Sequence, residues 1–213
     1  MAGFKGHLAF GMVTGLIWCC IIAYLSLLQP IFLPFIFVVT VLASFLPDLD
    51  SDGGVPLRVL LFVVSVISGL YVGYFSFQKN LDHSIISPIL YGLGYALFNY
   101  FVVGGVFKKI TVHRGIFHSI PAAILSILIT LTILNIYIDS LNQKLIFSIS
   151  VGIGYLCHLI LDELNSLVNL GGTPFIPNKS LGSALKFFSK NRFINITVYS
   201  LIVILFIYHL ISI

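Results

Sequence analysis

Charged residues are scarce in this sequence, and their scarcity decides the class of protein. They make up 8% of the 213 residues, whereas a soluble globular domain has about 25%. Eleven Lys and Arg with seven Asp and Glu cannot cover the surface of a water-soluble fold of this length, and hydrophobic residues make up 59%. The composition excludes a soluble domain and an intrinsically disordered chain. It indicates a protein with several membrane spans.

Cysteine is also rare, with three residues in the whole chain. Cys19 and Cys20 lie in one apolar run, Cys157 lies in another, and no Cys spacing repeats. An odd number of cysteines without a repeated spacing excludes a disulfide framework and a cysteine-based zinc motif. Any metal site in this chain therefore has to use other side chains.

Seven apolar segments are long enough to be candidate transmembrane helices, because a bilayer core about 30 Å thick needs around 20 apolar residues. The segments are 8–28, 31–46, 57–77, 85–107, 118–138, 145–161 and 193–213. Turn-forming sequences such as Gln29-Pro30 separate them. We therefore predict an all-α fold, a polytopic membrane helical bundle of about seven transmembrane helices, with residues 1–213 forming a single domain.

A short amphipathic stretch lies in the loop before the last segment. Its apolar residues repeat at helical spacing and lysines flank them: Leu181, Ala184, Leu185 and Phe188, with Lys179, Lys186 and Lys190. This pattern fits a short interfacial helix whose apolar side contacts membrane lipid. An ordinary amphipathic connector without a role in lipid binding fits the pattern equally well.

Basic residues lie mainly on one side of the predicted topology. With seven spans, nine of the eleven Lys and Arg fall on the face of the N-terminus, and Lys79 and Lys144 fall on the other. Because positive loops mark the cytoplasmic side, we predict a multi-pass inner (plasma) membrane protein with its N-terminus in the cytoplasm. The basic residues are dispersed over several loops without interleaved aromatics, so we expect no nucleic-acid partner.

The histidines and acidic residues form four groups near the ends of the predicted spans. They are His7 at the start of the first span, Asp48, Asp50 and Asp52 after the second, His113 and His118 before the fifth, and His158 and Asp162 at the end of the sixth. The alternation of spans puts all four groups on the predicted cytoplasmic face. Taken alone, each group also has a plainer interpretation, such as a solvated turn for Asp48 to Asp52 or a structural role for His7.

Imidazole and carboxylate are ligands that zinc, manganese and iron accept. His158 and Asp162 are four residues apart, so on a helix they lie on one face and can hold one ion. We predict a site for one or two divalent metal ions, zinc or manganese. Its candidate ligands are His7, Asp48, Asp50, His113, His118, His158 and Asp162.

The order of these motifs resembles the YdjM-type family of LexA-regulated inner-membrane proteins, which are regarded as metal-dependent hydrolases. The matching stretches are His7-x-x-x-Gly11, Leu46 through Asp50, His113-Arg114 through His118-Ser119, His158 through Asp162, and a tail from Gly171 to Pro177. The likeness extends from residue 3 to about residue 190. It implies a His/Asp metal site at the membrane and a hydrolytic activity.

For a hydrolase, the remaining polar residues near the motifs have assignable roles. Arg114 has the planar guanidinium that grips a phosphate or carboxylate, and we predict that it neutralises charge in the transition state. Glu163 or Asp52 would accept the proton of the attacking water. A site at the inner leaflet favours a phosphoester or lipid-type substrate, with membrane lipid as the surrounding partner.

Two other functions stay open at this point. A transporter of metal ions or protons would carry ionisable residues near the middle of its spans, and the centres of the seven predicted spans contain no charged residue or histidine. A non-catalytic membrane scaffold would use the metal to tie helix ends together, with every coordination position closed by protein. The sequence does not separate a scaffold from an enzyme.

Overall fold

A computed structural model describes residues 3–50, 55–79, 85–105, 116–167, 185–189 and 191–212. Within these residues the chain forms seven α-helices and no β-strand, which confirms the predicted all-α fold. Contacts divide the chain into two compact units, Met1–Asp48 with Arg114–Ile213, and Leu49–His113. The single domain over 1–213 stays a prediction, and the two units are described in turn.

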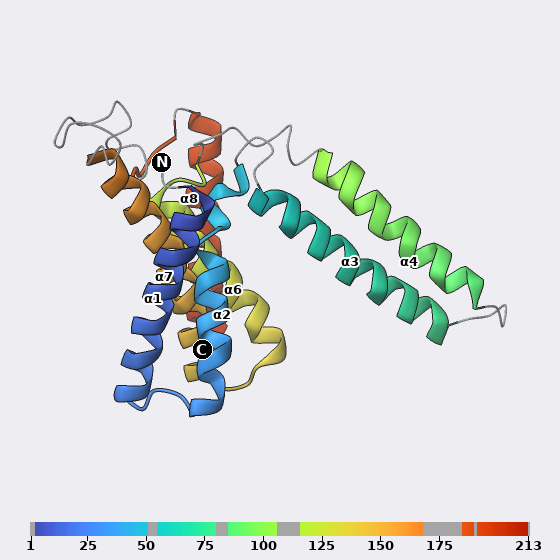
Figure 1. Cartoon of the computed structure of the whole chain (residues 1–213), viewed down its shortest axis with the longest axis horizontal. Helices are drawn as coiled ribbons and strands as arrows, with labels where there is room; N and C mark the ends of the chain where they lie inside the picture. The colour runs from blue at the N-terminus through green and yellow to red at the C-terminus, as the bar shows by residue number, and fades with distance from the viewer. Residues whose placement is uncertain are drawn as a thin grey trace. The chain divides into compact units, whose positions relative to one another are not determined.

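The first unit contains most of the long apolar helices. They are α1 (Phe4–Tyr24), α2 (Leu33–Ala43), α6 (Ile120–Tyr137), α7 (Leu141–Leu167) and α8 (Arg192–Ser212). Helix α2 is extended by two 3₁₀ turns, η1 (Pro30–Phe32) and η2 (Leu46–Asp50), so that Pro30–Asp48 forms one span. All five segments are long and apolar enough to cross a membrane, and Figure 1 shows α1, α2 and α7 running side by side.

Small residues let α1, α2 and α7 approach closely. A Cβ added at Gly154 on α7 would lie 2.2 Å from the carbonyl oxygen of Thr40 on α2. A Cβ added at Gly11 on α1 would lie 2.5 Å from Oγ of Ser44, at the end of α2. Helices in lipid associate largely through such close backbone contact. These glycines therefore hold the start of α1, the end of α2 and the second half of α7 together.

The second unit is a helical hairpin of α3 (Val55–Gln78) and α4 (Ile86–Phe98), followed by a π-helical turn, η3 (Asn99–Val103). The two helices are antiparallel, because Gly69 meets Ala96 and Gly73 meets Pro88. A Cβ added at Gly92 would lie 2.7 Å from the carbonyl oxygen of Gly69. Small residues along this hairpin allow its two helices to pack closely.

The surface of the described residues has the pattern of a membrane protein. Large apolar side chains are widely exposed, such as Ile17 on α1, Leu70 on α3 and Phe206 on α8. Several of the most deeply buried side chains are instead polar, and His7, His118 and His158 are each at most 1% exposed. An apolar exterior around buried polar groups agrees with helices surrounded by lipid.

The seven predicted segments overlap the seven helices, with differences at their ends. Helix α1 begins at Phe4 after Gly3, so His7 lies inside its first turns rather than before it. Helix α7 is 27 residues long and reaches Leu167, so it includes Asp162, which follows the predicted segment. Helix α4 with η3 is a shorter apolar helix, Ile86–Val102. That α3 and α4 cross the membrane stays a prediction.

The structure differs from the predicted interfacial helix. Residues 181–184 lie outside the described residues, and residues 185–189 form a bent, non-helical segment. Its backbone pairs with the start of α6, because Ile120 N donates to the carbonyl of Lys186 at 3.1 Å. Its other end is tied to α8, where the Asn195 side chain accepts from Ser189 N at 2.7 Å. These contacts to two helices outweigh the helical spacing of its apolar residues.

Candidate metal centre

Helix α7 carries two of the predicted ligands on one face. His158 is fully buried and Asp162 is 3% exposed, and their four-residue spacing places Nε2 of His158 3.7 Å from Oδ2 of Asp162. Burying an ionised carboxylate without a counter-charge costs several kcal/mol. The helix therefore carries a polar pair whose burial requires partners from other elements.

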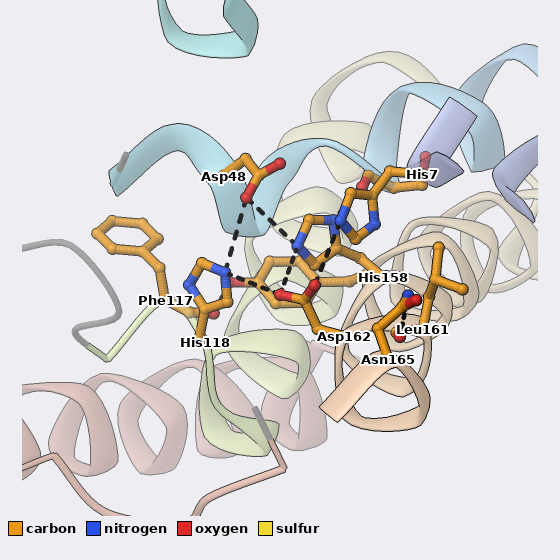
Figure 2. Close-up of polar contacts among 10 residues, drawn as sticks. His7, Asp48, Phe117, His118, His158, Leu161, Asp162 and Asn165 are labelled. Carbon is orange, nitrogen blue, oxygen red and sulfur yellow. Dashed lines mark hydrogen bonds and ion pairs between the residues drawn. The ribbon is translucent and has the colours of Figure 1, made fainter. Parts of the chain in front are cut away.

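Helix α1 supplies the first of these partners. Nε2 of His7 lies 3.4 Å from Oδ1 of Asp162, and the His7 ring stacks on the His158 ring (Figure 2). The close packing of α1 at Gly11 places this part of the helix against the end of α2, and α1 also packs against α7. Two imidazoles from distant parts of the chain thus contact the same carboxylate.

The end of the α2 segment supplies a second carboxylate. Oδ1 of Asp48 lies 3.4 Å from Nε2 of His158 and 3.7 Å from Nε2 of His118. The Asp48 side chain is 17% exposed. It is therefore the most accessible side chain of this group, and the carboxylate of Asp162 lies deeper.

His118 reaches the group from the turn that precedes α6. Its Nε2 lies 3.8 Å from Oδ2 of Asp162, and a dashed line marks this contact in Figure 2. The next residue, Ser119, is the N-cap of α6: its Oγ accepts a hydrogen bond from the backbone N–H of Ala122 at 3.3 Å. Since a serine N-cap fixes where a helix begins, it also fixes the position of His118.

The tautomer of His158 follows from one hydrogen bond. Nδ1 of His158 lies 2.7 Å from the carbonyl oxygen of Ser44 at the end of α2. A carbonyl can only accept, so Nδ1 carries the proton, and Nε2 presents its lone pair to Asp48 and Asp162. A histidine that donates one ring N–H to a carbonyl while its other nitrogen faces an ion is the usual arrangement in metal sites.

The distances within the group fit ligands of one ion better than they fit hydrogen bonds. The five His–Asp nitrogen–oxygen distances are 3.4–3.8 Å, and N–H···O hydrogen bonds are 2.7–3.2 Å. Two ligands bound at about 2.1 Å to a tetrahedral ion lie about 3.4 Å apart. Within the described residues, Nε2 of His158 and both carboxylate oxygens of Asp162 have no hydrogen-bond partner. Residues His7, Asp48, His118, His158 and Asp162, hereafter the His/Asp cluster, could therefore hold a metal ion.

The sequence from residue 1 to residue 213 matches the profile of the YdjM inner membrane protein family. The chain belongs to this family. It matches no curated protein and no solved structure. Membership in the YdjM family covers the whole chain, and it agrees with the membrane-type helices and with the resemblance drawn from the motifs.

Five of the seven ligands predicted for this YdjM-family chain come together in the His/Asp cluster. The backbone of Asp50 lies in η2, and its side chain is outside the described residues, as is all of His113. Of the predicted catalytic residues, Asp52 and Arg114 also lie outside the described residues. Glu163 lies on α7 directly after Asp162 and is half-buried.

Two groups around the site were missed in the sequence. One is the Ser44 carbonyl, which is main chain and carries no signal in the sequence. The other is Tyr155, whose hydroxyl donates to the carbonyl of Phe117, the residue before His118. Tyr155 is three residues before His158 on the same helix, so helical spacing predicts that the two side chains share one face.

Proposed function

We propose that this YdjM-family chain is an integral membrane, metal-dependent hydrolase whose centre is the His/Asp cluster. The observation that carries the proposal is the convergence of three buried imidazoles and two carboxylates from four separate segments, in which each imidazole has Nε2 within 3.8 Å of a carboxylate oxygen. Such a group is costly without a cation, because Asp162 is buried and, within the described residues, neither of its carboxylate oxygens has a partner at hydrogen-bonding geometry.

Each residue of the cluster has a definite part in this proposal. His7, His118 and His158 would offer neutral nitrogens, and Asp48 and Asp162 would offer the negative charge, a set that suits zinc or manganese. When bound, such an ion supplies Lewis-acid chemistry for the attack of water. The chain holds the set in place through the Ser44 carbonyl behind His158 and the serine cap behind His118.

The tautomer of His158 favours one ion over two. The described residues contain two overlapping groups of three ligands, His7–Asp48–His158 and His118–His158–Asp162, and both use His158. Because Nδ1 of His158 is committed to Ser44, Nε2 is the one nitrogen that remains, and it has a single lone pair. The two groups therefore merge into one site, and we propose a single divalent ion.

A substrate would approach from the side of Asp48, which is the most exposed member of the cluster. All four contributing segments end or begin at this end of the first unit, so the site lies near the level of a membrane surface. We propose the cytoplasmic surface, with a phosphoester or lipid-type substrate. Glu163 is proposed as the acceptor of the water proton, with Arg114 and Asp52 retained from the sequence as further catalytic candidates.

The test compares two buried histidines of the same unit. His158→Ala should lower the zinc or manganese content of detergent-purified protein from about one ion per chain to less than a tenth of that value. The matched control is His209→Ala on α8, because His209 is also buried and pairs with Thr132 at 3.0 Å, about 18 Å along α6 from Ile120. Equal metal content in wild type and His158→Ala would refute the site.

Hydrolysis is measured separately, on phosphodiesters and phospholipids, with and without a chelator. Activity that is lost with the chelator and restored by metal supports the hydrolase. The second candidate is a non-catalytic scaffold, which is favoured by the five ligands, since four suffice to close a structural zinc site. The scaffold would be favoured if wild type and His209→Ala both retain metal but hydrolyse neither phosphodiesters nor phospholipids.

A further inference from the structure

Tyr155 is a buried tyrosine directly behind the His/Asp cluster. It lies on α7 one turn before His158 and is 2% exposed. Its ring packs with Ala122, Ala123 and Leu159, and its hydroxyl donates to the carbonyl of Phe117. Buried tyrosine hydroxyls need a hydrogen-bond partner, and here the partner belongs to the turn that carries His118.

His118 differs from the histidines of α1 and α7, because it stands on a turn rather than within a helix. Its position depends on what holds residues 116–119. Ser119 caps α6, and Ile120 N pairs with the carbonyl of Lys186. These two contacts fix the turn to α6 and to the segment 185–189, neither of which carries His158 or Asp162.

The Tyr155 hydroxyl ties the same turn to α7, the helix that carries His158 and Asp162. Tyr155, His158 and Asp162 follow one another along one face of α7, at spacings of three and four residues. The hydrogen bond to Phe117 therefore sets the distance from His118 to the other two side chains. In a buried region of low polarity, such a bond is stronger and more directional than at a surface.

We propose that Tyr155 is a positioning residue, which holds His118 where its imidazole reaches the ion of the proposed metal centre. The inference rests on the proposed metal site and goes beyond it. Tyr155 does not touch the ion; it acts through His118. Removal of the Tyr155 hydroxyl should weaken metal binding, because His118 would no longer be held as a ligand. In Tyr155→Phe the aromatic ring remains, so its hydrophobic packing should be unchanged.

The first experiment is Tyr155→Phe in the full chain, with zinc affinity measured by competition against a chelator. We expect roughly tenfold weaker binding, the size of effect seen when a residue that orients a ligand is lost. With cobalt as the probe, the visible spectrum of Tyr155→Phe should shift toward that of His118→Ala. The control is Tyr71→Phe, since Tyr71 is an exposed tyrosine of α3 in the other unit, and it should bind zinc as wild type does.

The second experiment separates positioning from general stability by a double-mutant cycle. In the His118→Ala background, four residues of the cluster remain, and adding Tyr155→Phe should change zinc affinity by less than about twofold. An equal loss in both backgrounds would overturn the inference, because Tyr155 would then act on the fold rather than on His118. Unchanged affinity and spectrum in Tyr155→Phe would also overturn it, while leaving the metal site intact. A wild-type chain that binds no metal would instead refute the proposed function.

Discussion

The imidazole rings of His7 and His158 stack face to face, with centroids 3.7 Å apart and planes 10° apart. One ring comes from the first turns of α1 and the other from the second half of α7, so the stack joins the beginning of the chain to its longest described helix. Both rings also lie within 3.7 Å of Asp162. A cation bound here would connect α1 and α7 directly.

Metal removal should therefore lower the stability of the first unit. An ion that binds the folded state but not the unfolded state raises the free energy of unfolding by about 2.7 kcal/mol when its free concentration is 100 times its dissociation constant. We expect the thermal midpoint of detergent-purified protein to fall on chelation and to recover as zinc is added back. The measurement is thermal unfolding at graded zinc concentrations.

Asp162→Asn provides the comparison for this prediction. The variant keeps the shape of the side chain but removes its charge, so its thermal midpoint should not respond to zinc. A midpoint that rises with zinc equally in wild type and Asp162→Asn would show that the ion binds elsewhere.

Gly154→Ala should loosen the contact of α7 with α2. The added methyl group would lie 2.2 Å from the carbonyl oxygen of Thr40 and 2.8 Å from Cβ of Ala43. Overpacking of this kind typically costs about 1–3 kcal/mol. Because His158 is one turn further along α7, the separation should also weaken its bond to the Ser44 carbonyl and lower metal retention.

Gly94→Ala is the matched control, since a Cβ there meets no atom within 4 Å. Alanine is favoured over glycine in a helix by roughly 0.5–1 kcal/mol, so this variant should be at least as stable as wild type. Thermal unfolding and zinc content are measured on both variants. Equal behaviour of the two would mean that the close contact at Gly154 does not hold α2 and α7 together.

Gly92→Val should open the α3–α4 hairpin without changing the metal content. Its side chain would collide with the backbone of Gly69 and Gly73 on α3, and all five residues of the His/Asp cluster belong to the other unit. The readout is the rate of maleimide labelling of Ala96→Cys in a chain whose native cysteines are replaced by serine. We expect faster labelling and an unchanged zinc content. A loss of zinc in the same variant would contradict the prediction that the metal centre does not depend on the α3–α4 hairpin.

The two chain ends should lie on opposite sides of the membrane. Among its described residues, the first unit has five segments able to span, an odd number, and the antiparallel hairpin adds either none or two. The excess of basic residues on the side of the N-terminus predicts that this end is cytoplasmic. A phosphatase that is active only outside the cytoplasm should work when fused after Ile213 and fail when fused before Met1. The reverse result would place the His/Asp cluster on the outer side.

The sequence was sufficient for the parts of the site that depend on helical periodicity. His158 and Asp162 lie on one helix face because their spacing demands it, and the low charge content implies lipid-facing helices. The alternation of spans predicts only that His7, Asp48 and His118 share a membrane face with this pair. The structure adds that their side chains lie within a few ångströms of His158 or Asp162.

Other features depend on tertiary contacts that no local pattern encodes. The stretch around Leu185 has helical spacing, but pairing of Lys186 with the start of α6 keeps residues 185–189 in a bent, non-helical segment. Helix α7 extends beyond the predicted apolar segment 145–161, because polar residues such as Asn142 and Glu163 continue the helix at both ends. Tyr155 was overlooked because the value of its hydroxyl depends on where Phe117 lies.

The hydrogen bond from His158 to the Ser44 carbonyl should tolerate substitution of Ser44. The last carbonyls of a helix have no partner within that helix, and the one at Ser44 is used to orient an imidazole. Since the acceptor is part of the backbone, replacing the serine by alanine or threonine leaves it in place. The direction of the His158 ring is thereby secured by where α2 stops and not by which residue stops it.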